Sequence, residues 1–227
     1  MKKHFIIALA FSLFTVVQFA KAQQVPNPKP PMWDDVQAIK RYDGMFAPPQ
    51  HPIIFTGSSS IRRWDDAQWI FANYPVLNRG IGGAVTNDVL FYLNDIVLKY
   101  QPKQIVLYVG ENDLVDKRLN STVDSVYNRT MKLYSAIRAK MPEVPILYIG
   151  MKPSPSREVI VPMELEFNKR MKDFFAKEKN TKFIDIYPLM LAKDGKMRPE
   201  LYVGDKLHMT KLGYDIWEKA VKPNLIK

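Results

Sequence analysis

The sequence predicts an α/β fold in which a parallel sheet of five strands lies between two layers of helices. Five short apolar segments read as buried strands, because they are too short for helices and end at Gly or polar residues. They lie at 53–56, 76–78, 104–109, 145–149 and 183–186. Segments with helical periodicity separate most of them. Strands that alternate with helices form parallel sheets covered on both faces, which gives a three-layer α/β/α sandwich.

The predicted helices lie at 33–43, 86–100, 121–141, 162–179 and 211–221. In the first, Trp33, Val36 and Ile39 share one side. Thr86 is the expected N-cap of the second, and the segment 121–124 resembles a capping box at the start of the third.

Length and composition restrict the class of protein. The chain has 227 residues, of which 47% are hydrophobic and 25% charged, as is typical of a globular α/β domain. It has no cysteine, which excludes disulfides, thiol catalysis and cysteine-held metal centres. The only histidines are His4, His51 and His208, so a metal site with several histidines is not expected.

The N-terminus has the layout of a secretory signal peptide. Two lysines precede an apolar run from Phe5 to Ala20, and the sequence Ala20-Lys21-Ala22 fits a cleavage site. We expect 1–22 to be removed near Ala22, with export across the inner membrane to the periplasm or the exterior. An uncleaved anchor is the alternative. The Pro-rich segment 23–32 is expected to be a linker, and 33–227 a single domain.

The charge balance is basic. The net charge is +10, or +7 once the three lysines of 1–22 are removed. Acidic residues interleave with the basic ones, and no nucleic-acid-binding motif is present, so neither nucleic acid nor stable membrane insertion is expected. The oligomeric state stays open.

Residues that directly follow the predicted strands are candidates for chemistry, because sites in open parallel sheets form at the carboxyl ends of strands. A run of three serines, Ser58 to Ser60, follows the first strand. A serine at such a turn is either a nucleophile at a helix N-terminus or an N-cap. Gly80, Gly82 and Gly83 follow the second strand, but Val85 breaks the dinucleotide-binding pattern.

Two further segments complete the pattern. Asn112, after the third strand, offers uncharged N–H donors to an oxyanion, or serves as a helix cap. Asp205 stands three residues before His208, a spacing that lets the carboxylate orient the imidazole; a surface pair is the alternative. His51 precedes the first strand, so it is expected at the opposite end of the sheet.

Taken in order, these four segments resemble the blocks of the SGNH (GDSL-type) hydrolase superfamily. The blocks are 54–61, 76–83, 110–113 and 205–208, and the second resembles the branch that contains platelet-activating-factor acetylhydrolase catalytic subunits and secreted bacterial esterases. The resemblance implies a flavodoxin-like strand order. One position departs from the family: Ser58 stands where Asp is usual, which keeps Ser58 and Ser60 open as alternative nucleophiles.

The resemblance also implies roles for residues. Ser59 is the expected nucleophile, His208 the general base and then acid, and Asp205 the group that orients His208. The N–H groups of Ser59 and Gly83, with the Asn112 side chain, are expected to form the oxyanion hole. No cofactor or metal is implied.

The expected function is hydrolysis of short-chain acyl esters, O-acetyl esters foremost, with carbohydrate esters favoured over lysophospholipids or short-chain lipids. Trp64, Trp69 and Tyr92 are candidates for stacking on sugars, although aromatic residues at such positions more often belong to the core. The alternatives are an inactive glycan-binding module and a metal-dependent phosphoesterase, for which Glu111, Asp113 and Asp185 are only loosely placed.

Overall fold

The computed structural model describes Pro26 and residues 28–227. The chain divides into two units, Met1–Pro30 and Pro31–Lys227, and the helices and strands of the described residues all belong to the second. The predicted signal peptide at 1–22 lies outside the described residues.

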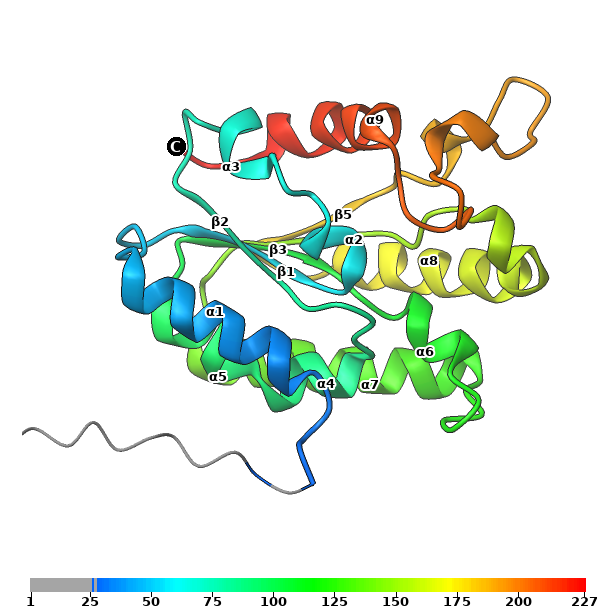
Figure 1. Ribbon diagram of the computed structural model, residues 1–227. Helices are drawn as coiled ribbons and strands as arrows, with labels where there is room; N and C mark the ends of the chain where they lie inside the picture. The colour runs from blue at the N-terminus through cyan, green and yellow to red at the C-terminus, as the bar shows by residue number, and fades with distance from the viewer. Residues whose placement is uncertain (1–25, 27) are drawn as a thin grey trace, which may run out of the picture. The chain divides into compact units, whose positions relative to one another are not determined.

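A parallel sheet forms the centre of Pro31–Lys227 (Figure 1). Its strands are β1 (Ile53–Gly57), β2 (Val76–Gly80), β3 (Gln104–Tyr108), β4 (Ile146–Ile149) and β5 (Thr181–Ile184). They are arranged in the order β2-β1-β3-β4-β5, and every pairing is parallel. The predicted fold class and strand order are therefore confirmed.

Helices cover both faces of the sheet (Figure 1). One layer comprises α1 (Trp33–Met45), α4 (Thr86–Phe91), α5 (Leu93–Ile96), α7 (Val123–Lys140) and α8 (Val161–Phe175). The other comprises α2 (Ser59–Arg62), α3 (Ala67–Ile70) and α9 (Lys211–Val221). Short connecting helices are α6 (Glu111–Val115), η1 (Leu98–Tyr100), η2 (Pro155–Ile160), η3 (Pro188–Met190), η4 (Pro199–Leu201) and η5 (Lys222–Asn224).

Side-chain alternation along the strands divides the core into two halves. In β1, Ile54 packs with the α1–α7 layer, whereas Ile53 and Phe55 pack with Trp64 and Trp217 on the other face. All five residues of β1 are buried. A strand buried on both faces reads as a continuous apolar run, which is why the sequence revealed it.

The predicted helix 86–100 is wrong as a single element. The backbone leaves helical geometry at Tyr92 and Val97, so α4, α5 and η1 form three short pieces. Thr86 is not the cap, because Val85 takes that position and Thr86 is buried. Its backbone N–H and its hydroxyl both donate to the buried carboxylate of Asp113.

Several other boundaries differ from the prediction; for instance, the helix predicted at 162–179 ends at Phe175. α7 begins after Thr122, which exchanges capping hydrogen bonds with Ser125, so the capping box lies one residue later than expected. The fifth strand begins two residues earlier, at Thr181, because its pairing with β4 sets the register from Ile146 onward. Its first residues are partly exposed, which hid them from a search for apolar runs.

Candidate active site

The predicted nucleophile Ser59 is the first residue of α2, directly beyond the end of β1. Gly57 makes this sharp turn, with φ of 127°. A Cβ atom at Gly57 would lie 1.9 Å from the carbonyl oxygen of Tyr108, so no other residue fits there. The N–H of Ser58 donates to the same carbonyl at 2.9 Å, which fixes the turn against β3.

The end of α2 is fixed by Asn78 of β2. The Asn78 amide donates to the carbonyls of Ile61 and Trp64, at 2.7 and 3.2 Å. Its oxygen accepts from the N–H of Gly80. This side chain therefore ties α2 to the neighbouring strand and holds Ser59 in place.

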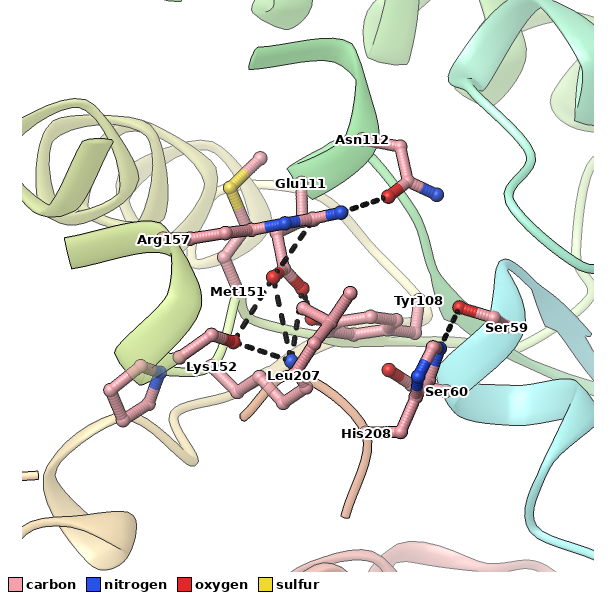
Figure 2. Close-up of polar contacts among 12 residues, drawn as sticks. Ser59, Ser60, Tyr108, Glu111, Asn112, Met151, Lys152, Arg157, Leu207 and His208 are labelled. Atoms are coloured by element: carbon pink, nitrogen blue, oxygen red, sulfur yellow. Dashed lines mark hydrogen bonds and ion pairs between the residues drawn. The ribbon is translucent and has the colours of Figure 1, made fainter. Parts of the chain in front are cut away.

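His208 reaches Ser59 from a loop that precedes α9 (Figure 2), and Asp205 of the same loop contacts His208. His208 Nε2 lies 2.9 Å from Ser59 Oγ, and His208 Nδ1 lies 2.6 Å from Asp205 Oδ2. Asp205 Oδ1 also accepts from the backbone N–H groups of Leu207 and His208. The structure thus joins three residues that the sequence spreads over 149 positions.

The other serines of the run are placed differently. Ser58 and Ser60 are buried, each about 4% exposed, whereas Ser59 is half-buried. The carbonyl of Ser60 accepts from the Tyr214 hydroxyl in the core. Of the three serines, Ser59 is the one in contact with His208.

Partial burial acts to raise the pKa of Asp205, but three hydrogen bonds outweigh it. The His208 ring and the N–H groups of His208 and Leu207 hold the pKa of this carboxyl well below its usual range. Asp205 therefore stays ionised and can stabilise a positively charged His208 ring.

The other histidine of the described residues, His51, lies shortly before β1 and bonds the Gln101 carbonyl. It is at the opposite end of the sheet from Ser59, as expected.

The predicted oxyanion-hole donors belong to the segments that follow β1, β2 and β3. Gly83, with φ of 71°, follows Gly82 in the loop after β2. The N–H of Gly82 donates to Asp35 of α1 at 2.6 Å, which fixes this loop. Asn112, in α6, donates from Nδ2 to the carbonyl of Ala84 at 2.9 Å. Among the described residues, the N–H groups of Ser59 and Gly83 have no hydrogen-bond acceptor.

A buried cluster of charged side chains adjoins Asn112. It centres on Glu111, whose carboxylate accepts from Tyr108, Lys152 and Ser154 and pairs with Arg157 at 2.9 Å. Burial acts to raise the pKa of Glu111, but the two cations and the hydrogen bonds lower it. Burial lowers the pKa of Lys152, against the attraction of Glu111. Sequence reasoning did not predict this cluster.

The residues that sequence reasoning missed are Asp35, Arg157 and this cluster. Asp35 precedes Gly82 by 47 positions, and Arg157 follows Asn112 by 45. No local pattern signals contacts over such separations.

The structure also bears on the alternative of a metal-dependent phosphoesterase. Among the described residues, no group of three or more acidic or histidine side chains is placed to hold a metal ion. Asp113 instead pairs with Arg129 at 2.8 Å.

The profile of the GDSL-like Lipase/Acylhydrolase family matches residues 54–216, which is more than half of the chain. The chain belongs to this family. It is a carboxylic ester hydrolase, as the family's acylhydrolase activity implies.

Curated relatives are platelet-activating factor acetylhydrolase IB subunits. The human alpha1 subunit is 25% identical over 211 residues, which cover 85% of this chain and 86% of the relative. The rat alpha2 subunit is 28% identical over 181 residues, with 75% and 73% covered.

Solved structures share the fold. A GDSL-like lipase from Bacteroides thetaiotaomicron has a TM-score of 0.70 at 20% identity, covering 83% of this chain and 96% of the other. A catalytic mutant of an acetylxylan esterase from Geobacillus stearothermophilus has a TM-score of 0.62 at 14% identity, with 78% and 96% covered. At these identities the likeness concerns the fold alone.

Proposed function

We propose that the protein is a serine esterase that works through an acyl-enzyme. Ser59 attacks the ester carbonyl while His208 takes its proton, and His208 then returns the proton to the leaving alcohol. Water, activated by His208, releases the acid in the second half-reaction. The observation that carries the proposal is the hydrogen-bonded line from Ser59 Oγ through His208 to Asp205.

The same proposal assigns the oxyanion hole to Ser59, Gly83 and Asn112. The two backbone N–H groups lie at chain turns, and the Asn112 amide uses one of its two N–H bonds on Ala84. The second N–H bond is available for the negative oxygen of the tetrahedral intermediate. Neutral donors suit this role because they do not bind a carboxylate product too tightly.

We also propose short acyl groups, acetyl foremost. The support is that both the curated relatives and one group of structural neighbours carry acetyl in their names, as acetylhydrolase and acetylxylan esterase.

We further propose that the protein is exported from the cytoplasm. The layout of 1–22 supports export to the periplasm or the exterior, and N-terminal sequencing of the protein purified from its host would test it. A mature N-terminus near Gln23 is expected, and an intact Met1 would contradict it.

A hollow of about 420 Å³ beside α2 supports carbohydrate esters over lipid esters. It lies between α1, α3 and β2, and its lining includes Asp35, Arg62, Asp65, Gln68 and Trp69. Trp69 is 84% exposed, whereas Trp64 and Tyr92, also candidates for stacking, are buried in the core. Exposed aromatic rings beside planar polar side chains suit sugar rings. Arg62, which lines the hollow, is the last residue of α2, the one-turn helix that begins with Ser59.

The first test compares wild type with Ser59→Ala on p-nitrophenyl acetate. Loss of turnover in a variant that keeps its circular dichroism spectrum and Tm would support the proposal. Retained turnover would contradict Ser59 as the nucleophile and turn attention to Ser58 and Ser60. Turnover in neither protein, together with binding to glycans, would favour an inactive glycan-binding module.

The second test separates the substrate classes. Trp69→Ala should raise KM for acetylated xylo-oligosaccharides about tenfold, as the loss of one aromatic stacking contact implies, and leave KM and kcat for p-nitrophenyl acetate unchanged. Phe91→Ala is the matched control, since Phe91 is also well exposed but does not line the hollow. Unchanged KM for the oligosaccharides, with faster turnover of lysophospholipids, would replace the carbohydrate proposal by a lipid esterase.

A further inference from the structure

Arg157 contacts the candidate oxyanion donor directly. Its Nη2 donates to Oδ1 of Asn112 at 2.7 Å, and its Nη1 pairs with Glu111 Oε1 at 2.9 Å (Figure 2). The Arg157 side chain is only 12% exposed. One guanidinium therefore bridges two successive residues at the start of α6.

These contacts fix which way the Asn112 amide faces. A guanidinium has only donors, so the atom that faces Arg157 must be the amide oxygen. The carbonyl of Ala84 only accepts, so the atom that faces it must be the amide nitrogen. Both constraints agree. Figure 2 shows the amide oxygen turned toward Arg157 and the nitrogen on the side where Ser59 lies.

Arg157 is itself firmly held. Its partner Glu111 is kept in place by Tyr108, Lys152 and Ser154, all of them buried. The next residue back, Ser156, donates from both its N–H and its hydroxyl to the carbonyl of Lys206. Lys206 lies between Asp205 and His208. The segment that carries Arg157 thus contacts both the oxyanion side and the histidine side of the site.

We propose that Arg157 is a positioning residue for ester hydrolysis, which orients the Asn112 amide so that its free N–H bond meets the developing oxyanion. The inference rests on the proposed function, in which Asn112 is an oxyanion donor. Arg157 acts through Asn112 rather than on the substrate, and it was not among the residues implied by the family resemblance. Without it, one hydrogen bond to Ala84 is left to hold a side chain that must be ordered before the reaction begins.

The test is a double-mutant cycle with p-nitrophenyl acetate. Asn112→Ala should lower kcat by roughly 10²- to 10³-fold. Arg157→Met should lower kcat by about 10- to 100-fold with KM changed less than about twofold, since a charge-assisted hydrogen bond is lost. Arg157→Lys keeps a cation beside Glu111 but cannot bridge Glu111 and Asn112, so it should lower kcat while the variant keeps most of its stability. In the Asn112→Ala background, neither substitution should lower kcat further.

Arg138→Met is the matched control. Arg138 also uses its guanidinium on the chain, bonding the carbonyls of Val144 and Asn180 at the far end of α7. Its loss should lower Tm and leave kcat unchanged.

Each outcome has a distinct meaning. If Arg157→Lys lowers kcat by the same factor in both backgrounds, Arg157 does not act through Asn112 and the inference is overturned. A rise in KM with unchanged kcat would overturn it too, because Arg157 would then contact the substrate. If Asn112→Ala alone leaves kcat unchanged, the proposed oxyanion hole fails and the positioning role fails with it. Activity that survives in Ser59→Ala would instead refute the proposed nucleophile.

Discussion

Glu164 is a buried carboxyl group whose charge state should govern how stability depends on pH. It lies in the first turn of α8, its side chain is fully buried, and neither carboxyl oxygen has a hydrogen-bond partner among the described residues. Burial and the nearby negative charge of Glu111 outweigh the cations Lys152 and Arg157, and raise the pKa of Glu164 to about 8.

The sign of the effect follows from this raised pKa. In the unfolded chain the pKa of Glu164 returns to its ordinary value of 4.5, so between pH 4.5 and 8 the folded state holds a proton that the unfolded state lacks. The contribution of the protonated group to stability is complete below pH 4.5, declines as the pH rises, and is gone above pH 8. A difference of about 3.5 pH units, at about 1.4 kcal/mol each, sets a ceiling near 5 kcal/mol.

The perturbation is Glu164→Gln, which keeps the shape and removes the ionisation. The difference in unfolding free energy between variant and wild type isolates Glu164, because the other titrating groups are common to both proteins. The unfolding free energy of the variant minus that of wild type should rise by up to about 1.4 kcal/mol per pH unit between pH 5 and 8, because wild type loses stability there. Above pH 8 it should level off. In Tm this amounts to roughly 2–4 °C per kcal/mol for a chain of this size.

Urea unfolding followed by circular dichroism at pH 5, 6, 7, 8 and 9 measures this difference. The tyrosines that face Glu164, Tyr187 and Tyr202, have raised pKa values and remain neutral over this range. Their ionisation therefore does not enter. A difference that stays constant from pH 5 to 9 would refute the reasoning, since it would mean that Glu164 is already ionised in the folded protein.

Two other substitutions test the site and the turn that carries it. Asp205→Asn should lower kcat for p-nitrophenyl acetate by roughly 10³- to 10⁴-fold with Tm nearly unchanged, because an amide cannot stabilise a positively charged His208 ring; a fall of less than about tenfold would remove Asp205 from the mechanism. Gly57→Ala should destabilise by about 3–5 kcal/mol, because its Cβ meets the Tyr108 carbonyl and its φ is positive. Gly44→Ala, where no atom lies within 4 Å, is the control for calorimetry, and equal Tm values for the two variants would contradict the argument.

Local sequence patterns were sufficient for much of the fold. The strand at 53–56 is visible because it is buried on both faces, and α1 and α9 are visible from their apolar periodicity. The helix predicted at 86–100 begins where expected but is broken at Tyr92 and Val97, and its predicted cap failed for a tertiary reason. Thr86 turns its donors to the buried carboxylate of Asp113 instead of capping a helix. Propensity is a weak guide where such long-range contacts decide the backbone.

The candidate site divides in the same way. The sequence could single out Ser59, Gly83, Asn112, Asp205 and His208 as candidates because each follows a strand or lies in a short motif, and the carboxyl ends of parallel strands meet at one edge. Trp64, Trp69 and Tyr92 could not be told apart by sequence. Only the packing shows that two of them belong to the core and that Trp69 stands in a hollow.

The sequence by itself determined the α/β class, the order of the five strands along the chain and the residues that resemble a hydrolase site, because hydrophobic periodicity and short motifs are local properties of the chain. Only the tertiary structure decided that His208 reaches Ser59, that Arg157 contacts the Asn112 amide, and that Glu164 is buried near Glu111 with no hydrogen-bond partner in the described part of the chain. Hydrogen bonds and burial depend on distances between residues far apart in the chain, and those distances exist only once the two layers of helices have packed on the sheet.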